Sequence, residues 1–69
     1  MPLYQWVVKE RLDGKFTRLT FGLPHGVKRS VIVENPWAFD CDIERIGNAL
    51  VLGYLADVAE GAWVQYANA

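Results

Sequence analysis

Apolar and polar residues alternate along the first third of the chain, on both sides of Asp13-Gly14. An Asp-Gly pair between alternating apolar residues is a strong hairpin signal, because a tight two-residue turn needs positive φ at its centre. The pattern therefore predicts one strand over residues 3–12 and a second over residues 15–21, joined by a two-residue turn.

This turn determines which residues face each other across the hairpin. Val8 is expected opposite Leu19 and Trp6 opposite Phe21, so that both strands present apolar side chains to one face. Because side chains alternate along a strand, a slip of one residue would exchange the two faces. Tyr4 and Leu23 are expected to extend the apolar face. The other face is predicted to hold Val7, Lys9, Arg11, Phe16, Arg18 and Thr20.

A third strand is predicted over residues 27–34, after a turn at residues 22–26 in which Pro24 fixes φ. The β-branched run at residues 31–33 is stiff and suits a strand. The valines of this strand share one parity and join the apolar face. Arg29 has the same parity, so we expect it at a sheet edge or in the loop.

From Asp40 onward the apolar period changes to that of a helix, predicted over residues 40–60. Asp40 or Asp42 can cap its start, where the helix dipole favours negative charge. The inward stripe is predicted to be Ile43, Ile46, Leu50, Tyr54 and Val58, with Gly47 and Val51 beside it. An alternative ends the helix near Gly47-Asn48, a turn pair, and makes residues 49–55 a strand.

Gly61 is a candidate C-cap, and residues 62–66 are predicted to form a short fourth strand. The expected fold class is therefore α+β, in the order β-β-β-α-β. A small, mostly antiparallel twisted sheet would have one face covered by the helix. Residues 1–69 are predicted to form a single small domain.

Composition narrows the setting of this domain. Apolar residues make up 52% of the chain, enough for a packed core. The single cysteine excludes an intrachain disulfide and favours a cytoplasmic location. The start of the chain has no basic region followed by an apolar run, so no secretory signal is expected. The most apolar stretch, residues 49–64, is interrupted by Asp57 and Glu60, and we expect no membrane span.

Charge is distributed unevenly along the chain. Residues 1–30 hold six basic and two acidic side chains, net +4, and residues 31–69 hold one basic and six acidic, net −5. Such asymmetry indicates an interaction surface.

The chain is poor in the residues that catalysis needs, with one His, one Cys and one Ser. A Cys41–His25 dyad has no support from spacing, and Cys41 is interpreted as a packed residue near the helix start. The acidic residues around Asp42 lack the ligand spacing of a calcium loop and are interpreted as helix caps. We therefore predict no enzyme activity, no metal and no cofactor.

Two surfaces are candidates for partner binding. The first is a basic face of the hairpin, which interleaves cations with an aromatic residue, as single-stranded nucleic-acid binders do. It is predicted to comprise Lys9, Arg11, Phe16 and Arg18. The sequence pI of about 5.6 weighs against nucleic acid, and a solvated sheet face is the ordinary alternative. Lys9 directly opposite Arg18 would be unfavourable, which suits an acidic partner.

The second candidate surface is an apolar patch on the outer side of the helix. It is predicted to comprise Leu52, Leu55, Ala56 and Ala59. Trp37 and Phe39 are assigned either to this patch or to a hydrophobic staple at the helix start. A small chain that gains stability by pairing would use such a patch for a symmetric dimer. The alternative is that the sheet curls over this patch or that the predicted C-terminal strand covers it.

The sequence therefore predicts a non-enzymatic protein-interaction module, a small inhibitor or adaptor that works as a homodimer and binds a protein with an acidic surface. A phage or mobile-element origin would suit such a compact inhibitor. The alternative function is binding of single-stranded nucleic acid through the basic hairpin face.

Overall fold

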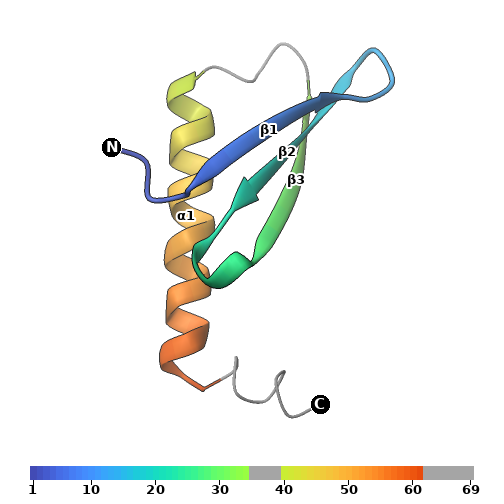
Figure 1. Ribbon diagram of the computed structural model, residues 1–69. Coiled ribbons are helices and arrows are strands. Elements are labelled where there is room, and N and C mark those ends of the chain that lie inside the picture. The colour runs from blue at the N-terminus through green and yellow to red at the C-terminus, as the bar shows by residue number, and fades with distance from the viewer. Residues whose placement is uncertain (35–39, 62–69) are drawn as a thin grey trace.

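Figure 1 shows a computed structural model of the chain, which describes residues 1–34 and 40–61. Three strands form an antiparallel sheet in the order β1-β2-β3, and one helix packs against one face of it. The elements are β1 (Trp6–Arg11), β2 (Phe16–Gly22), the short 3-10 helix η1 (Pro24–Gly26), β3 (Lys28–Glu34) and α1 (Asp40–Ala59). This is the predicted α+β layout, β-β-β-α. The predicted fourth strand lies outside the described residues, as do Trp37 and Phe39.

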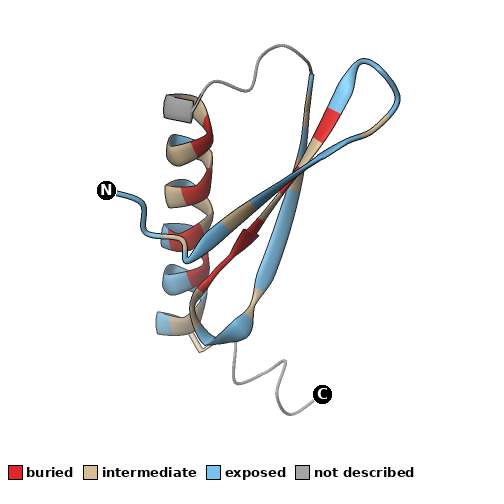
Figure 2. Ribbon diagram, turned by 45° about the horizontal axis from the view of Figure 1, so that its top comes forward, coloured by how far each residue is buried: buried red, intermediate tan, exposed pale blue. Residues whose placement is uncertain are grey.

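The core lies between the sheet and α1. It is formed by the apolar side chains that alternate along β2 and by those that recur with the helical period along α1. Leu19 and Phe21 of β2 are fully buried, and the buried residues visible in Figure 2 follow one side of the helix. Among the described residues, the buried cluster consists of Leu19, Phe21, Leu23, Ile43, Val51 and Tyr54. Ile46, Leu50 and Val58 pack against it, so the predicted inward stripe is confirmed. The alternative in which the helix ends near Gly47 is wrong, because α1 continues without a break to Ala59.

Gly47 lies where α1 closely approaches the N-terminal segment and β2. A Cβ at this position would overlap the Tyr4 ring and lie 2.7 Å from Cε2 of Phe21. The two rings meet edge to face, with centroids 5.1 Å apart. The backbone N–H of Leu3 also donates to Oδ1 of Asn48 at 2.7 Å. These contacts of Leu3 and Tyr4 hold the segment before β1 against the first half of α1.

The hairpin register differs by one residue from the prediction. Val7 lies opposite Phe21, and Val8 lies opposite Thr20. The loop has three residues instead of two, because the backbone N–H of Leu12 bonds to the carbonyl of Phe16 at 2.9 Å. The shift leaves the faces of β2 as predicted but exchanges those of β1: Val7 points to the core, whereas Trp6 and Val8 point away from α1.

Charge explains why this register is the better one. The predicted register would have set Lys9 against Arg18, two cations. The observed register sets Glu10 against Arg18, and their side chains form an ion pair of 2.9 Å. Opposite charges across an antiparallel pair stabilise it, whereas like charges destabilise it. Tyr4 still reaches the core, because it precedes β1 and is not constrained by the pairing.

Among the described strands β3 lies at an edge of the sheet, where Arg29 was expected. Its guanidinium lies 4.0 Å from a carboxylate oxygen of Asp57 on α1. The predicted turn at residues 22–26 contains η1, within which His25 adopts a left-handed conformation with φ of 65°. This conformation directs the His25 ring to α1, where Nδ1 and the Tyr54 hydroxyl are 2.7 Å apart. This contact therefore joins η1 to α1 at one end of the core.

Candidate binding surfaces

The side of the sheet away from α1, here called the open face, presents four large apolar side chains to solvent. Trp6 is 39% exposed, Val8 54%, Phe16 42% and Ile32 59%. They come from all three strands and share one face, as the pairing register requires. Isolated exposed apolar residues are ordinary, but a group on one face of a small domain marks an interaction surface.

Trp6 is held in place on the open face by a glycine of the neighbouring strand. It pairs with Gly22, and a Cβ at Gly22 would overlap the Trp6 indole. The indole therefore lies against the backbone of β2, which buries Gly22 while leaving the ring partly exposed. A binding partner would therefore cover the exposed part of the Trp6 ring at little cost in side-chain entropy, since the ring is already restrained.

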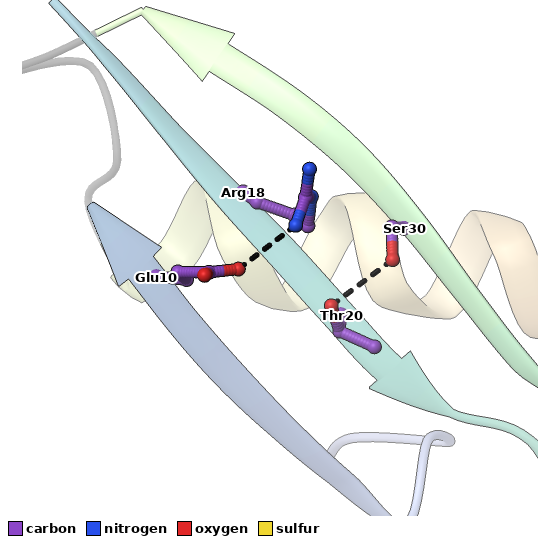
Figure 3. Close-up of polar contacts among 4 residues, drawn as sticks. All are labelled: Glu10, Arg18, Thr20 and Ser30. Carbon is purple, nitrogen blue, oxygen red and sulfur yellow. Dashed lines mark hydrogen bonds and ion pairs between the residues drawn. The ribbon is translucent and has the colours of Figure 1, made fainter. Parts of the chain in front are cut away.

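The open face also carries polar pairs, two of which are shown in Figure 3. Nη1 of Arg18 donates to Oε1 of Glu10 at 2.9 Å, and the hydroxyls of Thr20 and Ser30 are 3.0 Å apart. Each pair joins side chains of neighbouring strands. An exposed ion pair of this kind contributes only about 0.2–1 kcal/mol to stability. Its main effect is to hold the Arg18 guanidinium in place across the sheet.

The prediction that one face of the hairpin holds all four residues of the basic surface is wrong. Phe16 and Arg18 do lie on the open face, but Lys9 and Arg11 have the opposite parity. Lys9 pairs with Leu19, and Arg11 pairs with Thr17, on the side of the sheet that faces α1. The one-residue register shift separates the four residues. The opposed cations that favoured an acidic partner are also not found, since Arg18 is paired with Glu10.

The outer side of α1 has the exposed positions that the helical period predicts. Leu52 is 58% exposed and Leu55 is 41% exposed, and Ala56 and Ala59 are exposed too. A shallow hollow opens beside Leu52. It is lined by Glu44, Arg45, Asn48, Ala49 and Leu52. The amino group of Met1 lies 2.9 Å from a carboxylate oxygen of Glu44, so the N-terminal segment borders this hollow.

Sequence reasoning missed three residues of the open face: Trp6, Val8 and Ile32. Trp6 and Val8 were assigned to the core by the wrong register. The charge of Glu10 was the available signal, because only the three-residue loop brings Glu10 opposite Arg18. Ile32 could have been found from parity alone, since its neighbours in β3 point to the core.

The His25–Cys41 dyad is excluded by the fold. His25 contacts Tyr54, thirteen residues after Cys41 on the same helix, a separation of about 20 Å at 1.5 Å per residue. Within residues 1–34 and 40–61, no three His, Cys, Asp or Glu side chains gather closely enough to hold a metal ion. No helix in this part of the chain is long and apolar enough to cross a membrane.

No family model, curated protein or solved structure matches this chain. Its function must therefore be inferred from the two surfaces, the open face and the outer side of α1.

Proposed function

We propose that this chain is a non-enzymatic protein-interaction module, a small inhibitor or adaptor that docks a larger protein on the open face of its sheet. The observation that carries this proposal is the exposure of Trp6, Val8, Phe16 and Ile32 on the face that α1 leaves uncovered. Large apolar side chains that gather on one uncovered face are typical of a docking surface.

The residue types on the open face are those that contribute most to protein–protein affinity. Tryptophan and arginine are enriched among the residues whose truncation weakens an interface most, provided that they lie near its centre. Trp6 is restrained against Gly22, and Arg18 is restrained by Glu10. Both are partly exposed, so docking would complete their burial without first having to order them.

The charges of the open face define the chemistry of the partner. Arg18 and Lys28 are balanced there by Glu10 and Glu34. A face with no net charge does not select a strongly acidic surface. We therefore propose a partner whose contact surface is mainly apolar at the centre, with polar groups of both signs at the rim.

The test compares the same substitution on the two sides of the molecule. Ile32→Lys puts a charge on the open face, whereas Leu52→Lys, at nearly equal exposure, puts one on the outer side of α1. Ile32→Lys should weaken partner binding by at least about 1.5–3 kcal/mol, the free energy of burying an aliphatic side chain. Leu52→Lys should leave the affinity for the partner unchanged. A pull-down with the tagged chain from nuclease-treated native lysate would identify the partner. Calorimetry with the purified chain and partner would then measure the binding affinity of each variant.

Circular dichroism should show both variants folded, because both positions are already exposed. A purified partner that binds Ile32→Lys and the unaltered chain equally would contradict the proposal. The proposal would also be wrong if Leu52→Lys weakened binding as much as Ile32→Lys did.

Single-stranded nucleic acid is the second candidate ligand, because the open face carries two exposed aromatic residues beside a cation. Trp6 and Phe16 offer rings for base stacking, and Arg18 offers charge for a phosphate. The acidic pI and the Glu10–Arg18 pair make this the weaker candidate.

If the open face binds nucleic acid, Arg18→Gln should reduce affinity for an oligonucleotide and lower its dependence on salt by about one phosphate contact. Arg11→Gln removes the same charge from the opposite face and should have a smaller effect. Fluorescence anisotropy of a labelled oligonucleotide at several salt concentrations would measure both. Equal losses in the two variants would indicate non-specific attraction to positive charge.

A further inference from the structure

The outer side of α1 carries a shallow hollow that can receive a side chain of another helix. The hollow beside Leu52 includes Arg45, Asn48, Ala49 and Leu52, at the spacing i, i+3, i+4 and i+7. Four residues at this spacing form the hole that receives one side chain of a facing helix. One turn further along, Leu55 projects from the same side. It is 41% exposed, as a side chain that enters the hole of a facing helix must be.

We infer that a second copy of this chain occupies this side, with the two α1 helices antiparallel and related by a twofold axis near Leu52. In this arrangement Leu55 of each copy enters the hollow of the other, and the two Leu52 side chains meet at the axis. The same patch is used by both copies, as a closed symmetric dimer requires. The partner is therefore this chain itself, and both leucines are buried at once.

The charges at the two ends of the patch fit this pairing. Arg45 is the basic residue of α1, and Glu60 follows the last turn, where its N–H bonds to the carbonyl of Ala56 at 3.1 Å. Both are exposed, and neither forms an ion pair with another described residue. They lie seven and eight residues from Leu52, about 10 and 12 Å along the helix axis. The twofold axis therefore brings Arg45 of each copy opposite Glu60 of the other.

A parallel pair would instead set Arg45 against Arg45 and Glu60 against Glu60. Like charges across a helix pair are unfavourable, so charge selects the antiparallel arrangement. The small side chains of Ala49, Ala56 and Ala59 allow the helix axes to approach closely. The exposed alanines alone would not specify a partner, but the hole, Leu55 and the two end charges define one register.

The inference extends the proposed function without depending on it. α1 and the open face belong to opposite layers of the molecule, so pairing through α1 leaves both open faces free. A dimer would carry two partner-binding faces, each of which binds one partner molecule. Self-association and partner binding can thus be measured separately.

The decisive experiment is a charge exchange between the two ends of the patch, measured by sedimentation equilibrium from micromolar to near-millimolar concentration. Arg45→Glu alone and Glu60→Arg alone should each weaken the dimer about tenfold, since each replaces two attractive contacts by two repulsive ones. The double variant should restore the affinity of the unaltered chain. Glu60→Arg changes the net charge only from −1 to +1, so general repulsion cannot explain a loss.

Two further variants separate this surface from the open face. Leu52→Lys should give a monomer over the whole concentration range, whereas Ile32→Lys should associate like the unaltered chain. Glu34→Arg, with the same change of net charge as Glu60→Arg but on the sheet, should not weaken the dimer. An unaltered chain that stays monomeric throughout would overturn the inference. So would a charge-exchanged double variant that is no tighter than its single parents, because the register would then be wrong.

These outcomes are independent of the proposed function. If Ile32→Lys keeps its partner while the charge exchange behaves as expected, the open face is wrong and the dimer stands. If the charge exchange fails while Ile32→Lys loses its partner, the dimer is wrong and the open face stands.

Discussion

Replacing Phe21 with alanine should leave most of the chain unfolded at 25 °C. Phe21 is fully buried, and its ring contacts Tyr4 and borders Gly47 on α1. Phe→Ala substitutions in a core cost about 3–5 kcal/mol. A single core in a domain of this length rarely supplies more than about 3–5 kcal/mol of stability, so the loss is comparable with the whole. Urea unfolding followed by circular dichroism would measure it.

Phe16→Ala is the matched control, because Phe16 lies on the opposite face of the same strand and is 42% exposed. Its cost should stay below about 1 kcal/mol, in the range of surface substitutions that remove partial burial. If the two variants lost similar stability, the assignment of the two faces of β2 would be incorrect. The comparison also tests the sheet without reference to any partner.

Gly47→Ala and Gly53→Ala should change stability in opposite directions, although both lie within α1. A methyl group at Gly47 would collide with the rings of Tyr4 and Phe21, and such overpacking costs about 1–3 kcal/mol. The higher helix propensity of alanine offsets up to about 1 kcal/mol of this. Gly53 has no heavy atom within 4 Å of an added Cβ, so only the propensity gain of about 1 kcal/mol remains.

The difference between these two glycine variants measures how closely α1 approaches the N-terminal segment. Thermal and urea unfolding at low protein concentration would give both values without a contribution from self-association. A stabilised Gly47→Ala variant would mean that Tyr4 does not lie over the helix. In that case the N-terminal segment, including the Leu3–Asn48 hydrogen bond, would need to be placed elsewhere.

The open face and the outer side of α1 differ in how they arise from the sequence. Leu52 and Leu55 could be identified from the helical period alone, since a continuous helix with Ile43, Gly47 and Tyr54 inward must turn them outward. The open face depends on strand register, which one additional loop residue reverses. The exposed residues were therefore predicted correctly where one helix defines them, and incorrectly where two strands must align.

The sequence by itself determined the three strands, the helix and its buried stripe, because each follows from a local period of apolar residues. Only the tertiary structure decided the register of β1. Asp13-Gly14 is compatible with a loop of two or three residues, and either register gives β1 an inward apolar side chain, Val8 or Val7. The choice came from contacts across strands and layers: the Glu10–Arg18 ion pair and the packing of Val7 against the core that β2 shares with α1. These energies depend on which side chains meet across strands and layers, and the local period of apolar residues does not distinguish the two registers.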